Sequence, residues 1–107
     1  MEAEFAHEFI RGRGRFAYEP IIASGKSSCV LHYIDNDKEC KDGDILLLDV
    51  GAEYANYNAD LTRSIPVNGR FSKRQKDVYN AVLRVKRQAM KLLRAGTRYF
   101  DYHKEVQ

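Results

Sequence analysis

Residues 45–69 read ILLLDVGAEYANYNADLTRSIPVNG, and this stretch decides the fold. It contains two strand-like runs, and each run carries one acidic residue. Asp49 interrupts the first, apolar run, and Asp60 stands eleven positions later at the start of the second. An unpaired carboxylate in an apolar interior costs several kcal/mol, so such acids normally have a partner. The two aspartates therefore predict either an ion pair or a bound cation.

The two runs are expected to pair as an antiparallel hairpin around the residues EYAN, 53–56. The midpoint between the two aspartates falls between Tyr54 and Ala55, so a turn centred there places Asp49 directly opposite Asp60. Directly opposed residues have Cβ atoms ~4.5–5.5 Å apart. Two carboxylates that close repel each other unless a proton or a cation lies between them.

The second run adds further oxygen atoms to the face of the acids. Its alternate polar residues are Asp60, Thr62 and Ser64, and its apolar ones are Leu61, Ile65 and Val67. Thr62 is therefore predicted on the acids' face, within reach of a metal-bound carboxylate. Oxygen-only ligands suit a pair of divalent ions and favour manganese over a structural zinc. From spacing alone a structural alternative stays open, in which Asp49 pairs with Arg63 and Asp60 caps a turn.

The residues before the hairpin predict one helix and two short strands. Phe5, Phe9 and Ile10 have helical spacing within the first ten residues, and glycines at positions 12 and 14 end that helix. Residues 19–25 and 28–33 are predicted as two strands joined by a turn, and a polar loop with a turn at Asp42-Gly43 follows.

The residues after the hairpin predict a long helix over about 72–95. Ser72 and Gln75 form a capping box at its start, and Gly96 is expected to end it with a left-handed cap. Its apolar stripe is expected to pack against a sheet; the stripe consists of Val78, Val82, Val85, Ala89 and Leu92. A second helix is predicted after Gly96.

The composition is that of a soluble globular protein. Of 107 residues, 44% are hydrophobic and 31% charged, which predicts one domain with a modest core. No apolar run approaches the ~20 residues that cross a bilayer, and no signal peptide opens the chain. Two cysteines are too few for a disulfide framework and fit a reducing compartment. We therefore expect a cytoplasmic protein with no membrane partner.

Three weaker patterns indicate other classes of function. Cys29, His32 and Cys40 are one ligand short of a structural zinc site. Asp35 begins an acidic alternation like a calcium loop, but Cys40 stands where that loop needs glycine. The net charge is +3, and the basic run RGRGR at residues 11–15 precedes two aromatic residues, which is one route to RNA binding. A glycine-rich turn explains that run equally well, and no nucleic-acid partner is expected.

Two separated motifs resemble the pita-bread metallopeptidases. Residues 49–71, DVGAEYANYNADLTRSIPVNGRF, contain Asp-x-Gly, a loop with tyrosines and then Asp-x-Thr-Arg, and residues 30–33, VLHY, precede them in the family's order. The Thr-Arg ending and the PVNGRFS that follows resemble the Xaa-Pro aminopeptidases and proline dipeptidases more than the methionine aminopeptidases. The likeness extends from about His7 to Gly96.

The resemblance implies an α+β fold: an antiparallel sheet with packed helices, half of a pita-bread (creatinase/aminopeptidase-like) fold. Residues 1–107 would be a single incomplete domain, the first half of the catalytic domain. In the family two aspartates, a histidine and two glutamates hold two divalent metal ions. Asp49 resembles the aspartate that serves one metal and Asp60 the bridging one, while His32 resembles a histidine that contacts substrate. We expect two metal ions, manganese by preference, in the complete domain.

The resemblance also implies a function that this chain performs only in part. The expected substrate is a peptide with proline in the second position, cleaved before that proline. The ligand histidine and both glutamates belong to the second half of the family's domain, and His7 and His103 lie outside the motif. The isolated chain is therefore expected to be inactive and to self-associate through its exposed sheet edge. The alternative is a non-catalytic pita-bread module that binds peptides or proteins.

Overall fold

Antiparallel sheets and helices account for the regular structure of the chain. A computed structural model describes all residues, 1–107, and they divide into two units, Met1–Arg70 and Phe71–Gln107. The predicted α+β class is confirmed.

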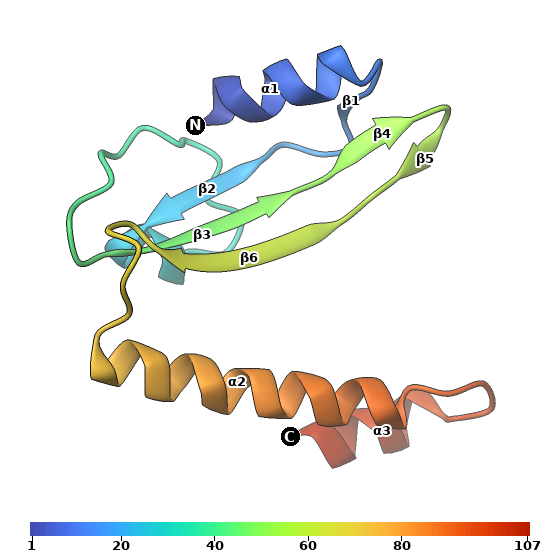
Figure 1. Ribbon diagram of the computed structural model, residues 1–107. Coiled ribbons are helices and arrows are strands. Elements are labelled where there is room, and N and C mark those ends of the chain that lie inside the picture. Colours follow the sequence, from blue (N-terminus) through green and yellow to red (C-terminus); the bar gives the residue numbers. More distant parts are fainter. The chain divides into compact units, whose positions relative to one another are not determined.

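The first unit contains one helix, one short 3₁₀ helix and two three-stranded sheets (Figure 1). In chain order its elements are α1 (Glu2–Arg11), β1 (Arg15–Phe16), β2 (Ile21–Ser24), η1 (Gly25–Cys29), β3 (Ile45–Val50), β4 (Ala52–Tyr54), β5 (Tyr57–Asn58) and β6 (Leu61–Pro66). One sheet has the order β2-β3-β6 and the other β1-β4-β5, with all neighbours antiparallel.

Strand β3 lies in the centre of its sheet, between β2 and β6 (Figure 1). One face of this sheet supplies the buried apolar side chains Ile22, Leu46 and Val50, which are 8%, 3% and 7% exposed. Asp49 points to the opposite face, since successive residues of a strand alternate. The apolar run therefore has a core face and a second face that carries the acid.

The hairpin forms as predicted, but the predicted register is wrong by two residues. Asp49 lies opposite Thr62, not Asp60, and the same pairing continues to Tyr54 opposite Tyr57. The turn is the two residues Ala55 and Asn56, both with positive φ (52° and 68°), as in the type I′ turns that suit hairpins. Asparagine tolerates this conformation, and a Glu53 carboxylate oxygen accepts the Asn56 N–H at 2.6 Å. Because of these local preferences, the turn is centred between Ala55 and Asn56, one residue later in the chain than predicted.

The strand predicted over 28–33 is also wrong. Gly25 has a positive φ of 55° and begins η1 instead. The Ser28 hydroxyl donates to the Gly25 carbonyl at 2.6 Å, and Val30 N–H donates to the Ser27 carbonyl at 3.0 Å. These short-range bonds satisfy the backbone locally, so no ladder forms there. The other early predictions, α1, β2 and the turn at residues 42–43, are confirmed.

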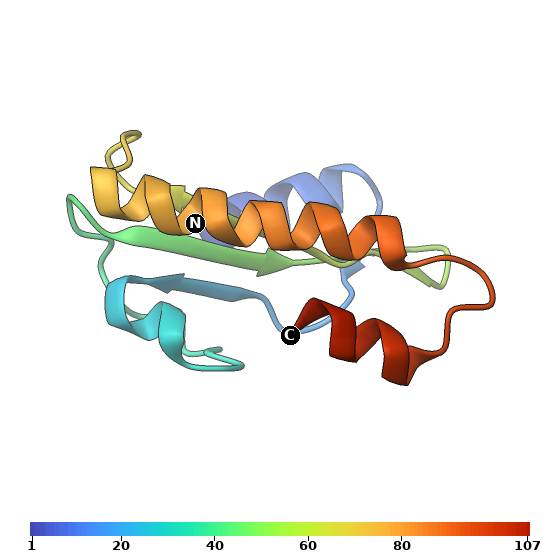
Figure 2. The same cartoon turned by 90° about the horizontal axis from the view of Figure 1, so that it is seen from below.

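The second unit is a pair of helices, α2 (Lys73–Leu92) and α3 (Tyr99–Val106). The capping box is confirmed: Gln75 N–H donates to the Ser72 hydroxyl, and the Gln75 side chain accepts from Ser72 N–H. Helix α2 ends three residues earlier than predicted, and Gly96 has its positive φ (89°) in the following loop. Figure 2 shows the chain turning back there, so that α3 lies beside the end of α2.

The apolar stripe of α2 is covered by its own unit only near Ala89, which is buried. Val82, in the middle of the stripe, is 64% exposed. That the stripe packs against a sheet stays a prediction. None of the helices is both long enough and apolar enough to cross a lipid bilayer.

Candidate metal centre

The carboxylates of Asp49 and Asp60 converge on one tyrosine hydroxyl. Tyr18 Oη lies 2.7 Å from Oδ1 of Asp49 and 3.2 Å from Oδ1 of Asp60, and it is the donor in both contacts. A phenol carries a single hydrogen, so the two carboxylates share it. The structure thus brings together the two aspartates that the sequence predicted as a pair.

The two acids are neighbours on a diagonal of the hairpin. Asp49 is on β3 and half-buried, whereas Asp60 is exposed and precedes β6 by one residue. Diagonal residues of an antiparallel pair lie ~7–8 Å apart, rather than the ~5 Å of opposed ones. A shift of two residues leaves every side chain on its original face. The predicted common face of the acids and Thr62 is therefore correct, although the predicted opposition is not.

Tyr18 reaches the acids because backbone contacts carry the chain over Gly51. Strand β1 pairs with β4, and beyond it Ala17 N–H donates to the Gly51 carbonyl at 2.8 Å. A Cβ atom on Gly51 would stand 2.7 Å from Cε1 of the Tyr18 ring and 2.9 Å from the carbonyl carbon of Ala59. Only glycine leaves room for both. The glycine of the Asp-x-Gly motif is thus explained by the close approach of the Ala59 carbonyl group first and of the Tyr18 ring second.

The site favours the protonated form of the tyrosine. Partial burial of the phenol raises the pKa of Tyr18 strongly, and the hydrogen bond to Asp49 and the negative charges of both aspartates raise it further. Tyr18 therefore remains a hydrogen-bond donor at neutral pH.

The donor set suits a hard divalent cation, although it is incomplete. Oδ2 of Asp49 and Oδ2 of Asp60 accept no hydrogen bond, so each carboxylate keeps an oxygen open. Carboxylate oxygens are the ligands that manganese and magnesium prefer. No cluster of three or more His, Cys, Asp or Glu side chains suited to a metal occurs in the structure. The residues present therefore fit part of a metal site.

The structural alternative for the two acids finds no support in their contacts. Arg63 donates to the carbonyl of Thr62 at 2.8 Å and makes no ion pair with Asp49. Asp60 accepts only from Tyr18 and caps no turn.

The histidines do not join the acids through any contact. His32 is exposed, has a positive φ of 54°, and makes no hydrogen bond or ion pair. His7 lies 4.0 Å from Glu8, and His103 stacks on Tyr99 with a centroid separation of 6.1 Å. The predicted substrate role of His32 stays a prediction. Both cysteines are free, with Cys29 exposed and Cys40 half-buried.

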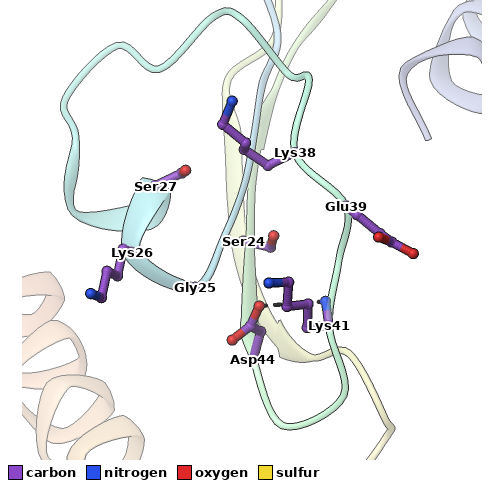
Figure 3. Close-up of a pocket in the computed structure, with 8 residues that line it drawn as sticks. All are labelled: Ser24, Gly25, Lys26, Ser27, Lys38, Glu39, Lys41 and Asp44. Carbon is purple, nitrogen blue, oxygen red and sulfur yellow. Dashed lines mark hydrogen bonds between the residues drawn. The ribbon is translucent and has the colours of Figure 1, made fainter.

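A pocket of about 430 Å³ lies away from the carboxylate pair. Figure 3 shows Lys26, Lys38 and Lys41 around it, with Glu39 and Asp44 among the same lining residues. The backbone N–H of Lys41 donates weakly to Asp44 at 3.4 Å. Charges of both signs line this pocket, and neither candidate metal ligand takes part in it.

Tyr18 is the site residue that sequence reasoning missed. It lies 31 positions before Asp49, and no local pattern links the two. The available signal was indirect. A tyrosine placed just before a strand that pairs with the acid-bearing strand could have been considered as a donor to the acids.

Two carboxylates, each with an open oxygen, thus lie together on an antiparallel α+β scaffold. The sequence model of the family described as "Metallopeptidase family M24" matches residues 1–107, so the chain belongs to this family. The predicted relation to the Xaa-Pro aminopeptidases is confirmed as well. The chain is 42% identical over 107 residues to an Xaa-Pro aminopeptidase of Haemophilus influenzae, and 41% identical to one of Escherichia coli.

Solved structures give the same relation. The chain superposes on aminopeptidase PepP of Pseudomonas aeruginosa with a TM-score of 0.93 at 40% identity, and on a zinc-substituted E. coli aminopeptidase P in complex with product with 0.93 at 42%. Each match covers 98% of this chain and 24% of the other. Against the two curated relatives the shares are 99% of this chain and 25% or 24% of the relative. The chain therefore spans about a quarter of the length of its relatives.

Proposed function

We propose that this chain is the first half of the catalytic domain of a dinuclear metallopeptidase of the Xaa-Pro aminopeptidase type. The observation that carries the proposal is the convergence of the Asp49 and Asp60 carboxylates on the Tyr18 hydroxyl, with one oxygen of each left open. Identity of about 40% to Xaa-Pro aminopeptidases over nearly the whole chain supports the same assignment.

The spacing of the candidate residues adds support. Solved structures of E. coli aminopeptidase P include alanine variants of three histidines and two aspartates, and the first of these histidines precedes both aspartates. In that enzyme the first of these histidines precedes the first aspartate by 17 positions, and the second aspartate follows 11 positions later. His32, Asp49 and Asp60 have the same order and the same two spacings. Another variant replaces a glutamate 112 positions after the second aspartate, a spacing that reaches beyond Gln107.

Each candidate residue has a definite role in the proposal. Asp49 and Asp60 supply carboxylate oxygens to a pair of divalent ions, manganese by preference. Thr62, opposite Asp49, is placed to hydrogen-bond one of these carboxylates. His32 contacts the substrate near the scissile bond. Bound ions would supply Lewis-acid chemistry at the scissile carbonyl and at water.

The substrate of the complete domain is proposed to be a peptide with proline in the second position, cleaved before that proline, in the cytoplasm. The E. coli variant enzyme solved with substrate is of this family. The further ligands, a histidine and two glutamates, are proposed to come from a second half of the domain. Two carboxylates alone leave proton transfer and most of the coordination unprovided, so the 107-residue chain is proposed to be inactive by itself.

The first prediction tests the metal site and the inactivity together. Adding Mn²⁺ to the chain is expected to broaden the amide NMR signals of Gly51 and Thr62 at low millimolar metal, because a paramagnetic ion broadens nearby nuclei. No release of the first residue from an Ala-Pro peptide is expected in the same solution. The amide of Asp77 on α2, another acidic residue, is the internal control. Broadening spread equally over all exposed acids would contradict a specific site, and peptide turnover would contradict the inactivity.

The second prediction concerns self-association through β6, a free edge of the β2-β3-β6 sheet. The edge of β2 is partly closed, because Asn36 bonds both the Ile22 N–H at 2.8 Å and the Pro20 carbonyl at 2.9 Å. Strand β6 has only the Arg63 side chain on its Thr62 carbonyl and exposes Ile65 (42%). Unpaired edges with apolar side chains invite strand pairing.

Light scattering is therefore expected to give a mass of at least a dimer at high concentration. Ile65→Lys, which places a charge on the edge, is expected to shift the chain toward monomer. Ile10→Lys, at an isoleucine of α1 that is 69% exposed, is the matched control and should leave edge pairing intact. A monomeric wild-type chain at every concentration would count against the proposal.

A further inference from the structure

The geometry around Tyr18 gives it a task that the metal-ligand assignment does not include. Its hydroxyl contacts both aspartates, at 2.7 and 3.2 Å, and no other group. One phenol hydrogen thus links two carboxylates that belong to different segments of the hairpin. Without a cation between them, the negative charges of the two carboxylates repel each other.

The ring itself is held independently of the carboxylates. The Ala17 N–H bond to Gly51 fixes the backbone next to Tyr18, and the absent side chain of Gly51 provides the space for the ring. The backbone that carries the hydroxyl is therefore anchored by contacts that do not involve the two carboxylates. A donor held in this way restrains the orientation of both carboxylates.

We infer that Tyr18 is a positioning residue, which holds the Asp49 and Asp60 carboxylates converged so that a divalent cation meets an arranged pair. The inference rests on the proposed function, since it takes both acids as metal ligands. The tyrosine hydroxyl acts through the carboxylates by donating its hydrogen to their Oδ1 atoms, and the Oδ2 atoms stay available. Partners that orient metal-bound carboxylates typically contribute 10–100-fold to metal affinity.

Tyr18→Phe tests this inference because it removes the hydroxyl and keeps the ring against Gly51. The affinity for Mn²⁺, measured from broadening of the Gly51 and Thr62 amide signals, is expected to fall about 10-fold or more. Tyr57→Phe is the matched control: Tyr57 is 83% exposed in the same hairpin and its hydroxyl has no partner, so its loss should leave the affinity unchanged.

A second measurement needs no metal. The side-chain carboxyl ¹³C signals of Asp49 and Asp60 are expected to shift in Tyr18→Phe, while that of Asp77 stays in place. A merely structural tyrosine would lower stability without changing the Mn²⁺ affinity of the folded protein.

The outcomes separate the inference from the proposed function. If the wild-type chain shows no localised Mn²⁺ broadening, the proposed metal site fails and the inference falls with it. If the wild type binds Mn²⁺ and Tyr18→Phe binds equally well or more tightly, only the inference is overturned. Weaker binding together with the two carboxyl shifts supports it.

Discussion

Asp60→Asn is expected to reduce Mn²⁺ affinity by about 100-fold or more, beyond the 10–100-fold typical of residues that only orient a ligand. The substitution replaces a carboxylate by a neutral amide of the same shape and leaves Asp49 as the remaining charged oxygen ligand. Hard divalent ions depend on such negative oxygens. The measurement is Mn²⁺ titration followed by the amide signals of Gly51 and Thr62.

The same variant should not destabilise the metal-free chain. Asp60 is exposed, and its one hydrogen bond is the longer of the two that Tyr18 makes. Its negative charge also repels that of Asp49. In Asp60→Asn the loss of this repulsion offsets the weakened hydrogen bond from the Tyr18 hydroxyl. We therefore expect a urea midpoint equal to or above that of the wild type. A loss of affinity with intact stability assigns Asp60 to ligand binding.

Asp77→Asn is the matched control, because it removes the same charge from an exposed position on α2. It should leave the Mn²⁺ titration unchanged. If Asp60→Asn also binds as well as the wild type, the two acids are not metal ligands. The non-catalytic binding module then becomes the better reading of the chain.

The sequence predicted the parts of this fold whose signals are local. The capping box of Ser72 and Gln75 fixed the start of α2, since both bonds join residues three apart. The end of α2 was missed by three residues: Leu93 already leaves the helical region, and Gly96 takes its positive φ in the loop beyond. A glycine indicates a left-handed backbone position, but it does not indicate how many residues separate that position from the end of the helix.

The hairpin shows why a site can be predicted better than its geometry. The Ala55-Asn56 turn, with Asn56 bonded to the Glu53 carboxylate, set a register two residues from the expected one. An even shift leaves the faces of the strands unchanged, so Asp49 and Thr62 still share a face. The prediction that the two aspartates lie on one face is therefore correct, although the predicted register between them is wrong.

Tyr18 lies outside what local patterns can predict. Its approach to the acids depends on β1 pairing with β4 and on the Ala17–Gly51 hydrogen bond, contacts between distant segments. The Asp-x-Gly motif carried part of this information in its glycine, because a glycine within a strand-like run often marks the close approach of another group. The sequence did not show which group approaches.

That close approach leads to the second large effect, a loss of stability in Gly51→Ala. The new Cβ would stand 2.7 Å from the Tyr18 ring and 2.9 Å from the Ala59 carbonyl carbon, closer than real Cβ contacts. The ring could rotate away, but Ala59 is backbone and the hairpin must deform around it. Overpacking of this kind costs about 1–3 kcal/mol of unfolding free energy, and a backbone obstacle places the expected cost at the upper end.

Gly12→Ala is the control, because its Cβ would lie 3.4 Å from the Glu8 carbonyl and 3.5 Å from the Phe9 carbonyl, ordinary contacts at a φ of −77°. Restricting the unfolded chain there should stabilise the protein by about 0.4–1 kcal/mol. Urea unfolding followed by the amide signals of β3 measures both variants in the first unit. Equal midpoints for the two would show that Tyr18 and Ala59 do not close on Gly51 as described. A lower midpoint for Gly51→Ala, with weaker Mn²⁺ binding in the folded fraction, would show that this glycine supports both the hairpin and the tyrosine that orients its acids.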